Sequence, residues 1–97
     1  MLKGKQRSYL RGLANNIESI IQIGKNGLDE AVLKQIDEAL TARELIKITV
    51  LKNSLLDPYE TCQDVCHSLK AEPVQVIGNK FVIYRRNDKK PQINFPN

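Results

Sequence analysis

Residues 19–28, SIIQIGKNGL, contain the transition that decides the fold, from a strand through a glycine turn into a helix. The β-branched run Ser19–Ile23 is typical of a short buried strand. A G-x-x-G turn, Gly24–Gly27, follows it directly. Apolar residues then recur at helical spacing from Leu28 to about Ala42. The stretch therefore predicts one strand-to-helix unit of an α/β fold.

Hydrophobic periodicity predicts further elements on both sides of this unit. They are a helix over Lys3–Asn15, a strand over Leu45–Leu51, a helix that starts at Asp57-Pro58 and ends near Lys70, and strands over Pro73–Ile77 and Phe81–Tyr84 joined by a turn at Gly78-Asn79. The order α-β-α-β-α-β-β predicts a compact α/β domain with a four-stranded mixed sheet and packed helices. We expect the domain to span residues 1–86 and residues 87–97 to form a mobile polar and basic tail.

Charge is distributed unevenly along the 97 residues, whose formal net charge is +4. The first 17 residues hold four cations and no acid, and the middle of the chain is acidic. The last stretch contains one acid, Asp88, and five cations: Lys80, Arg85, Arg86, Lys89 and Lys90. If the two basic ends meet in space, they form a site for a polyanion. The alternative is two solvated, slightly basic termini. A membrane surface is disfavoured because no long lysine-rich amphipathic helix is present.

The glycine turn suits the approach of a phosphate backbone. Two glycines remove side-chain bulk, and Lys25 at the tip supplies a positive charge. Asp29 and Glu30 follow in the expected first helical turn, where they would repel a phosphate placed over the helix axis. We therefore expect an RNA backbone to pass over the loop tip. The alternative is a tight turn without a binding role.

No catalytic, metal or cofactor site is predicted. Cys62, Cys66 and His67 lack a second pair of ligands, and both thiols fall on an apolar helix stripe, so core positions are expected for them. His67 is expected at the surface. Phe81 is expected in the core, whereas Tyr9 and Tyr84 could either pack or stack on bases.

The N-terminal residues MLKGKQRSYLRG lack the apolar segment of a signal peptide, and no run of residues is long enough to span a membrane. Two cysteines four residues apart on a helix also fit a reducing compartment better than a disulfide scaffold. We expect a cytoplasmic protein.

Four segments together resemble the CRM-domain family, specifically the stand-alone bacterial YhbY type. They are GKQRSYLRGLA at 4–14, IQIGKNGL at 21–28, QIDEALTARELIKITVLKN at 35–53 and VQVIGNKFVIYRR at 74–86. The resemblance implies a fold similar to the C-terminal domain of bacterial translation initiation factor three. Bacterial members of that family associate with precursors of the large ribosomal subunit, and plant organellar relatives act in intron splicing.

The resemblance implies a non-enzymatic, RNA-binding ribosome-assembly factor with large-subunit rRNA and ribosomal particles as partners, and with no small-molecule substrate. The expected RNA-binding residues are Lys3, Lys5, Arg7, Arg11, Gly24, Lys25, Asn26, Gly27, Arg85 and Arg86. One alternative is a protein-binding adaptor that uses the acidic second helix on the ribosome. A small enzyme is a weaker alternative, because no nucleophile, base or metal set is visible.

Overall fold

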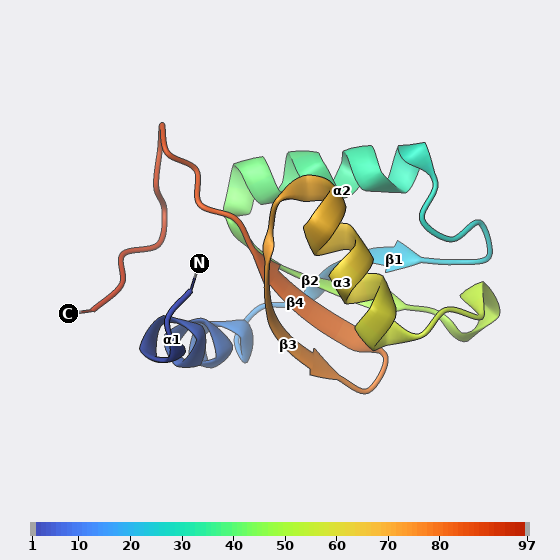
Figure 1. The fold of residues 1–97 in the computed structure, drawn as a ribbon, viewed down its shortest axis with the longest axis horizontal. Coiled ribbons are helices and arrows are strands. Elements are labelled where there is room, and N and C mark those ends of the chain that lie inside the picture. The colour runs from blue at the N-terminus through green and yellow to red at the C-terminus, as the bar shows by residue number, and fades with distance from the viewer. Residues whose placement is uncertain (1, 97) are drawn as a thin grey trace.

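Residues 2–96 are described by a computed structural model, and their helices and strands follow the order predicted from the sequence (Figure 1). The elements are α1 (Gly4–Ala14), β1 (Ser19–Ile23), α2 (Glu30–Arg43), β2 (Leu45–Val50), the short 3₁₀ helix η1 (Lys52–Ser54), α3 (Pro58–Leu69), β3 (Glu72–Ile77) and β4 (Lys80–Tyr84). The predicted α/β class with a four-stranded mixed sheet is confirmed. η1 was not predicted.

The sheet has the strand order β1-β2-β4-β3. β1 runs parallel to β2, while β4 is antiparallel to both of its neighbours, β2 and β3. Gly78 lies in the turn between β3 and β4 with a φ of +58°, and Ile77 pairs with Lys80 across that turn. This is the hairpin turn predicted at Gly78-Asn79, where glycine adopts a positive φ without strain.

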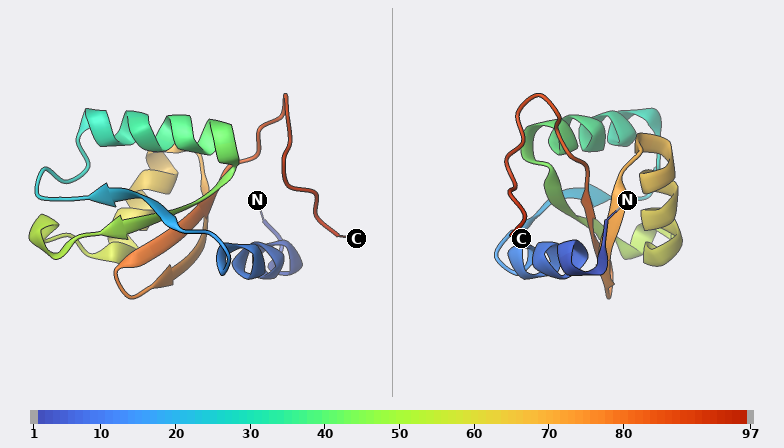
Figure 2. Two further views of the ribbon diagram at one scale, coloured as in Figure 1. Left: turned by 180° about the vertical axis from the view of Figure 1, so that it is seen from behind. Right: turned by 60° about the vertical axis from the view of Figure 1, so that its left-hand side comes forward.

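Helices cover both faces of the sheet, as the two views in Figure 2 show. Ile46 and Ile48 of β2 face the core formed with α2 and α3. Leu45 faces the opposite side, where it packs in a second core with Leu10 of α1. Successive side chains of a strand point to opposite faces, so β2 contributes apolar residues to both cores. Phe81, expected in the core, is fully buried.

The ends of the helices are fixed by local hydrogen bonds. α3 begins as predicted, because the Asp57 side chain accepts a hydrogen bond from the backbone N–H of Glu60 at 2.9 Å and Pro58 occupies the first turn. The prediction that α2 starts at Leu28 was wrong. Asp29 is its N-cap and accepts from the Val32 N–H at 2.9 Å, so the helix starts at Glu30.

The segment after β4 contacts the domain at several points. Glu44, which is buried between α2 and β2, accepts hydrogen bonds from the backbone N–H groups of Asn87, Gln92 and Ile93 at 2.6–2.8 Å. Phe95 packs edge-on against Tyr9 and Tyr84. The sequence predicted a mobile tail over residues 87–97 and none of these contacts. The contacts attach the described part of that segment to the second core.

Lys47 holds the end of α1 against the sheet. Its Nζ donates hydrogen bonds to the carbonyl oxygens of Ala14 at 2.9 Å and Ile17 at 3.0 Å. Lys47→Met keeps the apolar stem but removes the donor, so we expect it to lower the free energy of unfolding by about 1–2 kcal/mol. Urea unfolding measures the difference. Lys34→Met on the exposed face of α2 is the control, and an equal effect of the two substitutions would contradict this role.

Candidate nucleic-acid interface

The glycine turn between β1 and α2 is built by one backbone hydrogen bond. The N–H of Gly27 donates to the carbonyl oxygen of Gly24 at 2.9 Å. Gly27 has a φ of +64°, a conformation in which a residue with a side chain would be strained. Lys25 and Asn26 occupy the two central positions, and both are exposed. The turn therefore presents a cation and an amide on a backbone with little bulk around it.

The loop that contains η1 lies directly beside this turn, at the same end of the molecule (Figure 1). The N–H of Leu51 donates to the carbonyl oxygen of Ile23 at 2.9 Å, and a β-carbon placed on Gly24 would lie 3.8 Å from Cδ1 of Leu51. Lys52 follows immediately and is exposed. β1 and β2 are parallel neighbours, so their carboxyl ends meet at one edge of the sheet and bring Lys52 to the side of Lys25.

The start of α2 does not offer a phosphate site on the helix axis. The Asp29 carboxylate already accepts from the Val32 N–H there, and its negative charge repels an anion. A shallow hollow of about 270 Å³ lies between the glycine turn and the first turns of α2. This geometry leaves the loop tip open to a ligand, and the passage of an RNA backbone over it stays a prediction.

The cations of α1 lie on a separate surface. Lys3, Lys5 and Arg11 are exposed there. Arg7, which was also expected to bind RNA, is half-buried, and its Nε donates to the carbonyl oxygen of Pro73 at 3.1 Å. Arg7 therefore attaches α1 to β3 in addition to contributing charge.

The two basic ends of the chain meet in space. Arg86 lines a hollow of about 290 Å³ together with Leu2 and Gln6 from the N-terminal region and Lys70 from the end of α3. The nearby pair between Arg86 Nε and Asp88 Oδ1, at 3.2 Å, is exposed, and such surface pairs contribute little. The basic C-terminal stretch therefore lies beside the N-terminal region, in a hollow that the acid Glu72 also lines.

Arg85 differs from Arg86 because its guanidinium is engaged within the protein. Nη1 donates to the Asp37 carboxylate at 2.7 Å and to the Leu69 carbonyl oxygen at 3.0 Å. Nη2 donates to the Asp37 carbonyl oxygen at 3.0 Å and to the Thr41 hydroxyl at 2.9 Å. Arg85 therefore joins the second half of α2 to the end of α3.

The expected RNA-binding residues fall into two groups rather than one. α1 and the glycine turn lie at opposite ends of the long axis, as Figures 1 and 2 both show. That axis is 41 Å long. We call these two regions the loop end, which carries Lys25 and Lys52, and the helix end, which carries the cations of α1 and Arg86.

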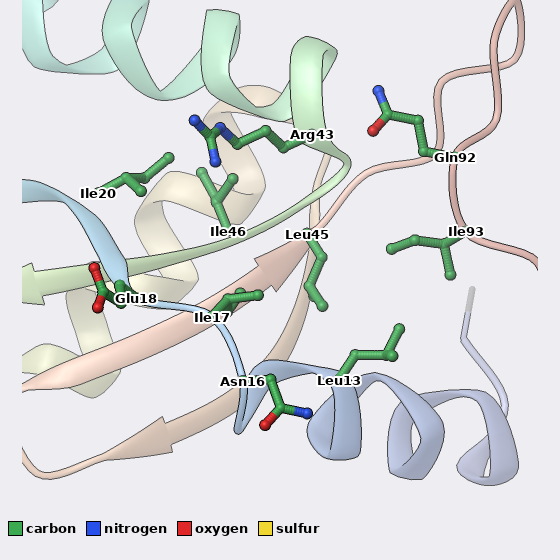
Figure 3. A pocket seen from close by; sticks show the side chains of 10 residues that line it. All are labelled: Leu13, Asn16, Ile17, Glu18, Ile20, Arg43, Leu45, Ile46, Gln92 and Ile93. Atoms are coloured by element: carbon green, nitrogen blue, oxygen red, sulfur yellow. The ribbon is translucent and has the colours of Figure 1, made fainter.

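A further hollow is a gap between packed elements. It measures about 800 Å³ and lies where α1, β1, the end of α2 and the C-terminal segment come together (Figure 3). Its walls are mostly aliphatic, and Figure 3 shows Glu18, Arg43 and Gln92 entering from three different elements without converging. Nothing in this lining resembles an acid-base pair or a nucleophile with its base.

The two cysteines are core residues, as expected. Cys62 and Cys66 are buried reduced thiols. The hydrogen bond with Cys62, together with burial, raises the pKa of the Cys66 thiol and keeps it protonated. His67 is exposed. Within residues 2–96 no group of three His, Cys, Asp or Glu side chains is arranged to hold a metal ion, and no helix there combines the length and apolarity needed to cross a bilayer.

Comparison with known protein families matches the model of the CRS1 / YhbY (CRM) domain to residues 2–85. The chain belongs to the CRM-domain family. The match covers α1, the glycine turn and the whole sheet, and it ends at Arg85. It confirms the resemblance seen in the four sequence segments.

Relatives of this CRM domain carry RNA-binding names. The Bacillus subtilis (strain 168) protein named "Probable RNA-binding protein YqeI" is 41% identical over 96 residues, which cover 99% of this chain and all of the relative. A Haemophilus influenzae protein named "RNA-binding protein" is 35% identical and is aligned over 91% of this chain and 89% of its own. The solution structure of a candidate RNA-binding protein from Staphylococcus aureus has a TM-score of 0.82 and 48% identity, with 99% and 100% of the two chains covered.

Lys52 and Lys70 of this CRM domain were not among the residues expected from the sequence. Lys52 lies beside the glycine turn only because β1 and β2 are adjacent and parallel. A β-α-β order does predict such pairing, and loops at the carboxyl ends of parallel strands commonly bind ligands, so this signal was available. Lys70 ends α3 with a φ of +55° and reaches the hollow near Arg86 only through the tertiary fold.

Proposed function

We propose that this CRM domain binds RNA through phosphate contacts and acts as a non-enzymatic assembly factor on precursors of the large ribosomal subunit in the cytoplasm. The observation that carries the proposal is that Lys25 on the glycine turn and Lys52 on the neighbouring loop lie at the same edge of the domain. Small residues let a sugar-phosphate backbone come close, and two lysines at the same edge attract it.

The helix end supplies the second contact surface. Lys3, Lys5, Arg11 and Arg86 are exposed. Cations at both ends fit an extended or structured RNA that lies along the domain better than they fit a small ligand. Because phosphate contacts position an RNA without reading its bases, the proposal predicts weak dependence on sequence from these residues.

The ribosomal part of the proposal rests on the family. The resemblance to stand-alone YhbY-type proteins, together with the RNA-binding names of the bacterial relatives, supports rRNA as the partner. The adaptor alternative has less support from the geometry, because Asp37 of the acidic α2 is occupied by Arg85 at 2.7 Å.

Two double variants test the two ends separately. Lys25→Gln/Lys52→Gln at the loop end and Lys5→Gln/Arg11→Gln at the helix end each remove two exposed cations. We expect each pair to weaken binding to rRNA fragments about tenfold, similarly for all sequences, because each cation neutralises one phosphate. Fluorescence anisotropy with labelled fragments measures the affinities. Arg7 is kept, because it also supports α1.

Lys34→Gln/Arg43→Gln is the matched control, since it removes two exposed charges from α2. It is expected to bind within about twofold of the wild type. An equal loss of affinity in the control and the test variants would show that net charge alone, and not the position of the cations, determines RNA binding. Binding to ribosomal proteins with none to purified rRNA would replace the proposal with the adaptor function.

A further inference from the structure

Leu55 is the most unusual apolar residue in the described chain. The residue is 93% exposed, and its backbone is left-handed with a φ of +60°. A bulky residue rarely adopts this conformation, and glycine or asparagine would adopt it at lower cost. Exposure and strain at one residue bring no packing benefit to the fold. Such outliers are found preferentially at functional sites.

The position of Leu55 is fixed by the end of η1. Its N–H donates to the carbonyl oxygen of Lys52 at 3.1 Å, and the next residue, Leu56, leads into the cap of α3. A β-carbon placed on Gly27 would lie 3.8 Å from Cδ1 of Leu56. The loop that contains η1, Leu55 and Leu56 therefore lies against the glycine turn. Lys25, Lys52 and Leu55 therefore share one edge of the domain.

We propose that Leu55 contacts an unstacked base of single-stranded RNA whose neighbouring phosphates lie over Lys25 and Lys52. This inference rests on the proposed RNA-binding function and adds a preference for unpaired RNA at the loop end. The cations supply attraction without selectivity, and the aliphatic side chain supplies a surface for the face of a base.

The chemistry distinguishes unpaired from paired RNA. In an A-form duplex both faces of each base are stacked, and side chains cannot enter the deep, narrow major groove. In a loop or bulge the bases can turn outward and rest on an apolar side chain while lysines hold the backbone. A fixed, exposed leucine beside a glycine turn fits the second case. A duplex would meet only the two lysines there.

Leu55→Gly tests the inference without endangering the fold, because glycine adopts a φ of +60° freely. We expect the variant to keep the wild-type urea midpoint. It should bind a single-stranded RNA of about 12 nucleotides about fivefold more weakly, while its affinity for the same strand annealed to its complement should change less than about twofold. Ile77→Ala is the matched control, since Ile77 is another exposed apolar residue but lies at the β3–β4 turn.

The outcomes separate this inference from the proposed function. Unchanged binding of Leu55→Gly to single-stranded RNA would overturn the role of Leu55, as would an equal loss on single-stranded and duplex RNA. In both cases wild-type binding that weakens with salt would leave the proposed function intact. A wild-type protein that binds neither RNA would overturn both. A loss with Ile77→Ala equal to that of Leu55→Gly would also overturn the assignment to the loop end.

Discussion

Replacing Glu44 with alanine is expected to lower the free energy of unfolding by about 2–3 kcal/mol and to release the C-terminal segment. The carboxylate is buried and accepts three backbone hydrogen bonds, from the N–H groups of Asn87, Gln92 and Ile93. Alanine leaves these donors without an acceptor. The loss is limited, because a detached segment regains hydrogen bonds to water and gives up only its packing through Ile93 and Phe95.

Urea unfolding measures the stability of the Glu44→Ala variant, and limited proteolysis reports on release of the segment after Arg86. Glu38→Gln, which changes an exposed acid on α2, is the control and should change the stability by less than about 0.5 kcal/mol. If the C-terminal segment of Glu44→Ala resists protease as well as that of the wild type, the Glu44 carboxylate does not hold the segment in place.

The contribution of Glu44 should depend on pH. Burial by itself raises the pKa of this carboxyl, but the hydrogen bonds from Asn87, Gln92 and Ile93 and the charge of Arg86 outweigh burial and lower the pKa below the ordinary value of 4.5. A lowered pKa means that the unfolded state binds the proton more readily. The stabilisation is therefore complete above pH 4.5 and is lost as the pH falls through the lowered value. The difference in the free energy of unfolding between the wild type and Glu44→Gln should therefore become smaller as the pH falls through the lowered pKa.

Binding of rRNA fragments is expected to weaken by roughly 100- to 500-fold between 50 and 200 mM salt. If about five cations engage phosphates, the logarithm of affinity falls with the logarithm of salt at a slope of roughly −3.5 to −4.5, because each contact releases counterions. The exposed cations at the loop end and the helix end are enough for this number. Anisotropy titrations at four or more salt concentrations give the slope.

The double variants make the salt experiment specific. Lys25→Gln/Lys52→Gln should reduce the slope by about 2, since two phosphate contacts are removed. The control Lys34→Gln/Arg43→Gln should keep the wild-type slope. An affinity that does not change with salt would rule out a phosphate-dominated interface at either end.

Much of the fold could be predicted from local patterns. The start of α3 at Asp57-Pro58, the turn at Gly78 and the strand from Leu45 each depend on residues close together in the sequence, and all three are confirmed. The start of α2 was placed two residues early, because the apolar periodicity begins at Leu28 before the helix does. Asp29 was expected in the first helical turn, but it accepts a hydrogen bond from the Val32 N–H and is the N-cap.

The candidate site could be predicted only in part. The sequence by itself determined which segments carry cations and that a glycine turn follows a strand, because these are properties of neighbouring residues. Only the tertiary structure decided that α1 and the glycine turn lie at opposite ends, that Arg85 is engaged by Asp37, and that the loop with Lys52 and Leu55 lies beside the glycine turn. The physical reason is that exposed side chains add little to the hydrophobic pattern that specifies the fold, so strand order and helix packing alone determine which of them become neighbours.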